Sequence, residues 1–280
     1  MAWTFTTDIE AYRDAADTLL TAQPVRHTVL LSVLGNLVRI GAGVFGDEPP
    51  LCGWWSQGGI ARAAVLQTPP YPMLVTALPG SAASQLAGAL ADRRATLSAV
   101  NGAEPDVSAF ARAWSQVTGR RGMVSQRQRL YQLGELVTPE PWPGGAARVA
   151  SSADRAVVMS LHDGFSAETG QSGSGARLVD DRLAERQLML WEVAGAPAAM
   201  AGMTAVICGV ARVGPVYTPP ELRGRGYGAA VTAAITQLAI DRGAQTVVLF
   251  TDLANPTSNS IYLRLGYRPV EDRLILNFIH

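Results

Sequence analysis

The sequence predicts an α/β (α+β) protein made of two tandem domains, and three observations support this prediction. The chain has 280 residues, of which 48% are hydrophobic and 16% charged, which is enough apolar material for two cores of ordinary size. A segment rich in Pro and Gly, Thr138–Gly145, cannot continue a helix or a central strand. The segments before and after it have a similar order of expected elements, which suggests an ancient duplication.

The Pro- and Gly-rich segment sets the expected domain boundaries, with a first domain at 1–138, a linker at 139–145 and a second domain at 146–280. In the first domain we expect Ser81 to cap a helix and Thr68-Pro69-Pro70 to form a turn. The expected helices there are 8–22, 25–39, 81–94 and 106–118, and the expected strands are 51–55, 61–67, 72–78 and 123–133.

The second domain has its helices and strands in a comparable order. We expect helices that begin near 154 and at 176, 227 and 256, and strands at 188–194, 198–208, 210–217, 245–251 and 268–278. The polar, glycine-rich stretch 169–175 is expected to be a flexible loop.

Composition also limits the function classes. Lys+Arg and Asp+Glu are both 23, which argues against a domain that binds nucleic acid mainly through phosphate contacts. Cys52 and Cys208 lie far apart in apolar surroundings, and neither belongs to a metal-spaced pair, so we expect two buried free thiols and no metal site. The chain start does not have the pattern of a secretory signal, and no apolar run reaches the length of a membrane span, so we expect a cytoplasmic protein with no membrane partner.

Three glycines separate a predicted strand from a predicted helix within Val213–Gly228. They alternate with other residues in the order Arg223, Gly224, Arg225, Gly226, Tyr227 and Gly228. Glycine lets the backbone approach a ligand closely and adopt positive φ. A helix N-terminus offers unpaired N–H groups and the positive end of the helix dipole, and arginine adds phosphate-binding donors. The segment therefore predicts a pyrophosphate-binding loop.

Two familiar nucleotide loops fit this segment poorly. A Walker A loop needs Gly-Lys-Ser/Thr at its end, and the chain has none here. The dinucleotide fingerprint is Gly-x-Gly-x-x-Gly, whereas the spacing here is Gly-x-Gly-x-Gly. Such a site also needs an acidic residue at the end of the next strand, for which Asp252 is a candidate.

The pattern Arg223-x-x-Gly226-x-Gly228 resembles the CoA-pyrophosphate loop of the GNAT superfamily of N-acetyltransferases. A second motif follows one strand later and resembles the next element of that family, Asn…Ala/Ser…x-x-Tyr-x-x-x-Gly-Phe/Tyr. Its residues here are Asn255, Asn259, Tyr262, Gly266 and Tyr267. Asn255 is also well placed to cap a helix that has Pro256 in its first turn. The detailed resemblance covers residues 148–280, and the first half fits by element order alone.

The resemblance implies two tandem GNAT-like domains, each with a mixed, largely antiparallel central sheet flanked by helices. It also implies that acetyl-CoA, as cosubstrate, lies between the strands Val213–Thr218 and Thr246–Asp252. Val216, Tyr217 and Thr218 would then bond the pantetheine arm, and one of their N–H groups would polarise the thioester carbonyl. The loop residues 223–228 would hold the pyrophosphate, and Asn255 and Asn259 would hold the pantetheine or the 3′,5′-ADP end.

The resemblance assigns Tyr262 the role of general acid, because a phenol can protonate the departing thiolate. The general base is open between Glu192, Glu168, Asp252 and His162, and deprotonation through water is a further alternative. Glu192 stands in a predicted strand and is the residue selected here.

The first half has no phosphate loop, since the corresponding stretch Ala77–Ser84 has one glycine and no arginine. We therefore expect residues 1–138 to be a degenerate copy that binds no CoA. The predicted function is direct transfer of an acetyl group from acetyl-CoA to a small-molecule or peptide amine. A non-catalytic acyl-CoA sensor and an aminoacyl-tRNA-dependent transferase are the alternatives. The acceptor and the oligomeric state are left open.

Overall fold

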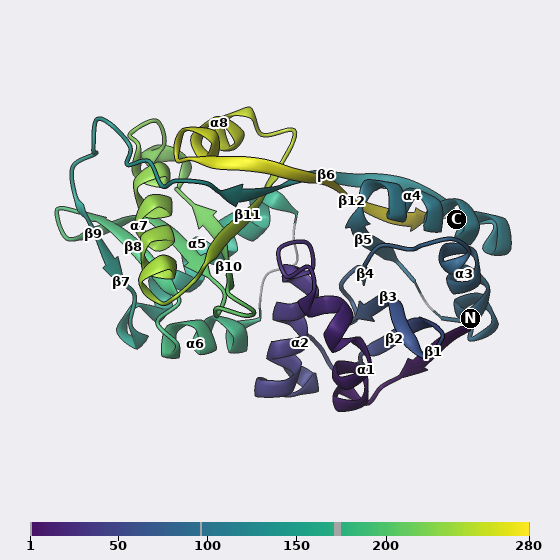
Figure 1. Cartoon of the computed structure of the whole chain (residues 1–280). Coiled ribbons are helices and arrows are strands. Elements are labelled where there is room, and N and C mark those ends of the chain that lie inside the picture. The colour runs from purple at the N-terminus through teal and green to yellow at the C-terminus, as the bar shows by residue number, and fades with distance from the viewer. Residues whose placement is uncertain (1, 96, 171–174, 280) are drawn as a thin grey trace. The chain divides into compact units, whose positions relative to one another are not determined.

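The computed structural model describes residues 2–95, 97–170 and 175–279, and the chain divides into two compact units (Figure 1). Unit 1 comprises Met1–Arg129, Asp252–Ala254 and Glu271–His280. Unit 2 comprises Leu130–Thr251 and Asn255–Val270. Two 13-residue strands, β6 (Arg121–Leu133) and β12 (Tyr267–Ile279), have one end in each unit. Residues 130–138 thus group with unit 2, and residues 271–280 group with unit 1. The two units therefore cannot be separated by dividing the sequence at one position.

Unit 1 is a sheet of mixed direction with two helices on each face. Its strands follow the order β1 (Ala2–Thr6), β2 (Leu51–Gln57), β3 (Ile60–Gln67), β4 (Met73–Val75), β5 (Ala99–Ala103) and β12. Its helices are α1 (Ile9–Thr21), α2 (Thr28–Ile40), α3 (Ala82–Asp92) and α4 (Glu104–Thr118), with a 3-10 turn at Ala42–Val44. β4 and β5 run parallel, whereas β5 and β12 are antiparallel.

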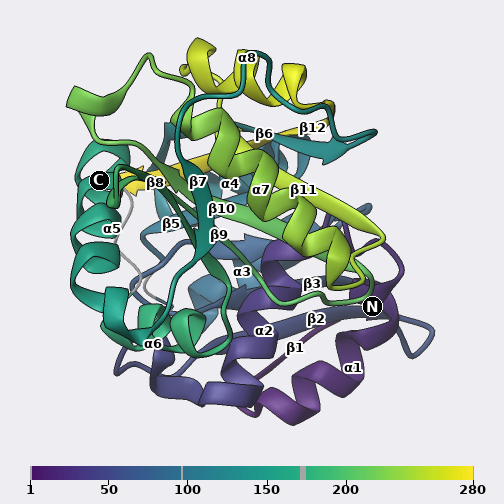
Figure 2. The ribbon, with the colours of Figure 1, turned by 90° about the vertical axis from the view of Figure 1, so that its left-hand side faces the viewer.

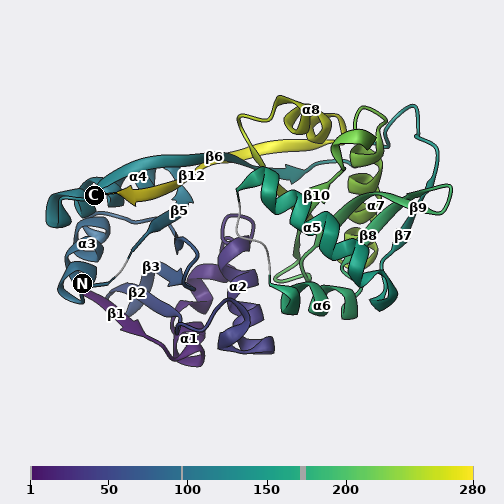
Figure 3. The same ribbon diagram turned by 180° about the vertical axis from the view of Figure 1, so that it is seen from behind.

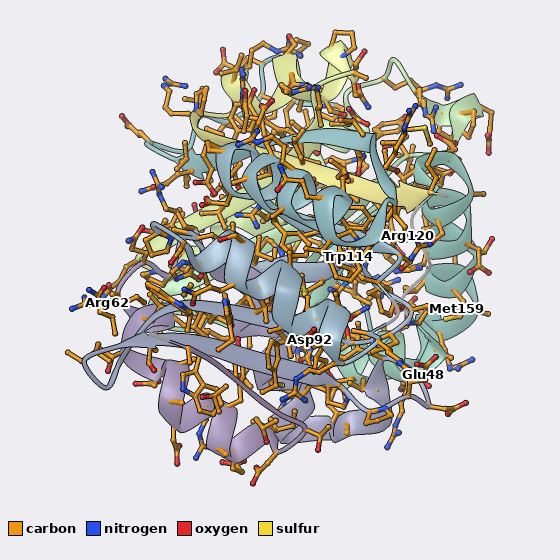
Figure 4. All side chains as sticks on the ribbon, turned by 90° about the vertical axis from the view of Figure 1, so that its right-hand side faces the viewer. Glu48, Arg62, Asp92, Trp114, Arg120 and Met159 are labelled. Atoms are coloured by element: carbon orange, nitrogen blue, oxygen red, sulfur yellow. The ribbon has the colours of Figure 1, made fainter. Side chains whose placement is uncertain are left out.

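The core of unit 1 forms where α3 and α4 pack on the sheet. Leu86 of α3 and Phe110 of α4 are fully enclosed, together with Val65 of β3. Trp114, on the inward face of α4, is 2% exposed and lies near Phe278 of β12 (Figure 4).

Unit 2 repeats this order of elements. Its strands follow the order β6, β11 (Thr246–Asp252), β10 (Val210–Tyr217), β9 (Ala196–Met203), β8 (Leu188–Val193) and β7 (Ala146–Val149). Its helices are α5 (Arg155–Thr169), α6 (Ala176–Ala184), α7 (Tyr227–Asp241) and α8 (Pro256–Arg264), with 3-10 turns at Ser152–Asp154 and Pro220–Leu222. β10 and β11 are parallel and the pairs β7–β8, β8–β9 and β9–β10 are antiparallel, which confirms the expected mixed, largely antiparallel sheet.

Helices cover both faces of the unit 2 sheet, as Figures 1 and 3 show from opposite sides. α7 supplies Val231 and Ile235 to one core, where they pack with Trp191 of β8. α5 and α6 supply Val158 and Val179 to a second core on the other face. The strands are therefore buried on both faces, which explains their nearly continuous apolar sequence.

Most expected elements are present, and the differences have local causes. Three short strands, β1, β5 and β7, were not expected. β9 ends at Met203 rather than 208, because the chain turns at Gly209, which has φ +75°. Cys208 is exposed in that turn, which corrects the expectation of a buried thiol, whereas Cys52 is buried. Ser81 stands at the start of α3 but makes no side-chain capping bond.

Part of the loop expected at 169–175, residues 171–174, lies outside the described residues. Of the helices in the described ranges, none has both the length and the apolar character needed to cross a bilayer. Within the same ranges, no three His, Cys, Asp or Glu side chains are grouped as metal ligands.

Gly266, which ends α8, has no space for a side chain. Its φ is +95°, and a Cβ atom would lie 1.8 Å from the carbonyl oxygen of Glu135. We expect Gly266→Ala to lower the free energy of unfolding by about 3 kcal/mol, because backbone strain and a backbone clash add. Gly195→Ala is the control, since Gly195 has φ +79° and open space around it, and we expect it to cost about 1 kcal/mol. Equal losses in urea unfolding would contradict this account.

Candidate cofactor and active site

The parallel pair β10 and β11 separates part of the way along its length. Backbone pairing joins Val210–Val213 to Thr246–Leu249 and stops there, although β10 continues to Tyr217. On its other side β10 stays paired with β9, since Val216 and Tyr217 pair with Ala201 and Met200. The last four residues of β10 therefore present backbone groups that are not bonded to β11, at the position where the resemblance expects the acyl-CoA arm.

An irregularity in β10 accompanies this separation. The register between β9 and β10 shifts between Val213 and Val216, which is a β-bulge. The carbonyl of Gly214, within the bulge, accepts a long hydrogen bond of 3.5 Å from the Arg182 guanidinium of α6. Bulges redirect a strand and often stand beside active sites.

The predicted phosphate loop lies between β10 and α7 (Figure 2). Gly226 is the N-cap of α7 and has left-handed backbone angles, φ +83° and ψ −4°. No side chain among the described residues caps this helix. The N–H groups of its first turn and the positive end of the α7 dipole are thus available to an anion, a feature of phosphate sites.

The Arg223 side chain forms hydrogen bonds with protein groups on both sides of this loop. Its Nε donates to the carbonyl of Thr218 at 2.9 Å, and its Nη2 donates to both oxygens of Glu168 at 2.6 and 2.7 Å. Arg225 lies on the surface and donates to the carbonyl of Glu221 at 3.3 Å. The ion pair between Arg223 and Glu168 connects the loop to α5, 55 residues earlier in the chain.

Tyr217, the last residue of β10, belongs to the same group. Its hydroxyl donates to Glu168 at 3.0 Å, and the ring packs so closely on α5 that a Cβ at Gly164 would lie 2.7 Å from the hydroxyl oxygen. The hydrogen bond from Arg223 lowers the pKa of Glu168. Glu168 is therefore held as a carboxylate that fixes the end of β10 and the loop together.

The two asparagines of the second motif hold the start of α8. Asn255 caps the helix as expected, since its side chain accepts from the Ser258 N–H at 3.0 Å. The Asn259 side chain accepts from the Tyr131 hydroxyl at 2.8 Å and donates to the Asn255 carbonyl at 2.7 Å. Their contact with a cofactor stays a prediction.

Tyr262 lies on α8 and is only 8% exposed, within the core cluster that also contains Val213 and Leu249. Its ring meets Tyr267 edge to face at 6.2 Å between ring centres. Burial raises the pKa of Tyr262 to about 12. The Tyr262 hydroxyl makes no hydrogen bond with the described residues, and this oxygen atom is not fully enclosed. The phenol is thus protonated at neutral pH and open to a ligand.

Glu192 makes ion pairs and hydrogen bonds in a local network. Its carboxylate accepts from Nη2 and Nε of Arg148 at 2.5 and 3.1 Å, and Arg148 also binds both oxygens of Asp154. The hydrogen bond from Arg148 lowers the pKa of Glu192. A carboxylate held in this way is a weak proton acceptor, and its role as general base stays a prediction.

The remaining candidate bases have different surroundings. Asp252 groups with unit 1, where it accepts from Gln126 at 3.0 Å and from the Ala254 N–H at 2.8 Å. His162 of α5 is 4% exposed, and its Nδ1 is enclosed without a partner among the described residues. Burial and the nearby Arg182 charge lower the pKa of His162, so the imidazole is neutral at pH 7.

Three residues of this region were not found from the sequence. Arg182 reaches the β10 bulge, Tyr131 holds Asn259, and Arg148 holds Glu192. Each acts through a partner at least 32 residues away in the chain, and no local motif signals such a pair.

Comparisons with known proteins agree with this geometry. Residues 195–275 match the family model described as FR47-like protein. A segment of 58 residues, 20% of this chain, is 41% identical to a mycothiol acetyltransferase of Arthrobacter sp. (strain FB24) and spans 18% of that relative.

Several solved structures resemble nearly the whole chain, and two of them illustrate this. One is a GCN5-related N-acetyltransferase from Sphaerobacter thermophilus, with TM-score 0.64 and 16% identity over 98% of this chain and 95% of that one. The other is a tandem GNAT protein from the clavulanic acid biosynthesis pathway, with TM-score 0.58 and 15% identity over 99% of this chain and 98% of that one. The chain therefore has the GNAT fold, and the resemblance found in its sequence is confirmed.

Proposed function

We propose that this GNAT protein transfers an acetyl group from acetyl-CoA to an amine, with the cosubstrate bound in unit 2. One observation carries the proposal: β10 leaves β11 after Val213 and leads directly into a glycine loop at the uncapped N-terminus of α7. The open strand offers backbone groups to an amide-containing arm, and the helix end suits a pyrophosphate. The residues present thus fit the pantetheine arm and the pyrophosphate of CoA.

The hydrogen-bonded group of Glu168, Arg223 and Tyr217 supports this assignment. It holds the end of β10, the loop and α5 in one arrangement before any ligand arrives. A site that is organised in advance loses less conformational entropy on binding. We propose that Arg223 positions the loop, whereas the N–H groups at residues 224–228 contact the pyrophosphate.

Bound acetyl-CoA supplies the thioester, and the amine attacks its carbonyl carbon. The C–N bond forms, the C–S bond breaks, and the thiolate takes the proton of the Tyr262 hydroxyl. Burial raises the pKa of Tyr262 to about 12, so the hydroxyl carries its proton at neutral pH. Burial also raises the pKa of a thiol in the same surroundings, so proton transfer to the departing thiolate stays feasible. The backbone N–H groups of 216–218 are the candidates to stabilise the carbonyl oxygen.

We propose that His162 accepts the proton of the amine, directly or through water. Its lowered pKa keeps the ring neutral at pH 7, so one ring nitrogen can accept a proton, whereas the Glu192 carboxylate is bound by Arg148. The Arg182 side chain that lowers the pKa of His162 also reaches the β10 bulge. The helices that carry these two residues, α5 and α6, pack on the face of the sheet opposite α7.

This role predicts both a titration and a kinetic result. The imidazole of His162 is expected to titrate below pH 6.5 in an NMR experiment, because burial disfavours its charged form. His162→Gln is expected to lower kcat/KM about tenfold, since water can replace part of the base's action. Glu192→Gln tests the other candidate base, and we expect a smaller loss of kcat/KM because Arg148 already binds the Glu192 carboxylate. A larger loss in Glu192→Gln than in His162→Gln would reverse the assignment.

A screen for thiol release tests the proposed function itself. Full-length protein and acetyl-CoA are incubated with small amines, amino acids and peptides, and products are checked by mass for an added acetyl group. Acceptor-dependent thiol release that requires Tyr262 supports transfer. If acetyl-CoA binds but no acceptor gives thiol release, a sensor role replaces the enzyme assignment.

A further inference from the structure

Unit 1 has a cavity of its own, of about 330 Å³. It lies at the carboxyl ends of the parallel strands β4 and β5, since it is lined by Val75 to Pro79 after one strand and by Ala103 and Asp106 after the other. The segment before α2 and residues of β12 complete its wall. Crevices at the carboxyl ends of parallel strands are common ligand sites, and this volume is within the usual range.

One wall of the cavity carries a neutral histidine whose orientation is fixed. The Nδ1 atom of His27 lies 3.1 Å from the carbonyl oxygen of Leu20, and a carbonyl can only accept, so Nδ1 carries the proton. Nε2 is then the acceptor nitrogen of the ring. Burial lowers the pKa of His27, which keeps the ring neutral at pH 7.

A carboxyl group provides a second acceptor on this wall. One oxygen of Asp106 accepts from the Leu78 N–H at 2.7 Å. For the other oxygen the described residues provide no hydrogen-bond donor, and the group lines the cavity. The neighbouring acid, Glu271, is occupied, because it pairs with Arg273 at 2.9 Å and with Arg26 at 3.4 Å.

The rim of the cavity carries a cation. Arg62 of β3 is exposed and lines the cavity, and its side chain lies at the edge of the unit in Figure 4. Among the described residues no acid forms an ion pair with its guanidinium. Arg26 pairs with Glu271 at 3.4 Å, but its side chain is 53% exposed, so its other guanidinium donors add to the positive rim. Two arginines toward solvent and two acceptors on the inner wall form a polarised site.

We propose that this cavity binds a small zwitterion that carries an amine and a carboxylate. The ammonium group donates to Asp106 and to Nε2 of His27, and the carboxylate pairs with Arg62 and Arg26. This site is separate from the proposed acetyl-CoA site and does not depend on it.

The chain next to this cavity does not suit a CoA pyrophosphate. α3 follows β4 as α7 follows β10, but residues 77–84 contain a single glycine, Gly80, and no arginine. Unit 1 therefore repeats the element order of unit 2 without its glycine loop, and the cavity at the end of its parallel pair is lined by groups that fit a smaller molecule.

Histidine NMR on the full chain gives a direct test, because the sequence has only three histidines. The probes are 4-aminobutyrate, butyrate and butylamine, which have the same carbon chain and either both charges or one. We expect 4-aminobutyrate to shift the His27 imidazole resonances saturably while His162 is unchanged. Butyrate and butylamine should bind about tenfold more weakly, since each loses one charged contact.

Arg62→Gln removes the rim charge at an exposed position and is expected to weaken 4-aminobutyrate about tenfold. Arg112→Gln, an exposed arginine of α4 outside the cavity, is the matched control and should bind as wild type. The proposal is overturned if no saturable shift occurs at His27, if butyrate alone binds equally well, or if Arg62→Gln has no effect. It is also overturned if acetyl-CoA is the molecule that saturates the His27 shift.

Discussion

Tyr262→Phe is expected to lower kcat for acetyl transfer about 100-fold or more, the usual scale for loss of a general acid. The ring remains and fills the same buried space, but the thiolate then leaves without a proton. The affinity for acetyl-CoA should change little, because the hydroxyl acts mainly in the transition state. Single-turnover measurements check this, since slow product release would hide the effect in the steady state.

Tyr267→Phe is the matched control for Tyr262→Phe. Both tyrosines are buried and their rings are in contact, but the Tyr267 hydroxyl lies 2.7 Å from the Thr236 hydroxyl, in a bond within the core. Loss of that bond should cost about 1 kcal/mol of stability and leave turnover unchanged. Normal single-turnover rates in Tyr262→Phe would identify Tyr262 as a packing residue.

Gly226→Val is expected to weaken acetyl-CoA binding more than 100-fold. The left-handed φ of +83° places the residue where a branched side chain is strained, and the side chain would stand at the α7 N-terminus where the backbone meets the pyrophosphate. Isothermal titration of the folded variant measures the loss.

Gly243→Val separates backbone strain from loss of the binding surface. Gly243 has φ +88° with open space around it, and it follows the C-terminal end of the same helix, α7. It should lose stability to a similar degree, about 1–2 kcal/mol, and bind acetyl-CoA as wild type. Wild-type affinity in Gly226→Val would locate the phosphate site elsewhere.

The sequence was most informative where a local rule fixes the structure. The loop glycines, the Asn255 cap and the bounds of β10 follow from turn geometry, capping and strand pattern within a few residues. β5 was missed because Ala99–Ala103 contains Gly and Asn and becomes a strand only by pairing with β4 and β12.

The arrangement of side chains around the site depends on distant partners. Arg223 was expected to face a phosphate, but its partner is Glu168, and Glu192 is held by Arg148. Both pairs join residues at least 44 positions apart, so only the folded chain brings them together. The sequence also does not predict that β12 completes the sheet of unit 1 and β6 the sheet of unit 2. The composition of a strand does not specify which strand it pairs with.

A crystal structure of the full chain with acetyl-CoA is the most direct test of the central claim. The account predicts one acetyl-CoA per chain, with its pyrophosphate on the N–H groups at the start of α7 and its pantetheine arm along Val216–Thr218. A cofactor bound in unit 1, or one that leaves the N-terminus of α7 untouched, would contradict it.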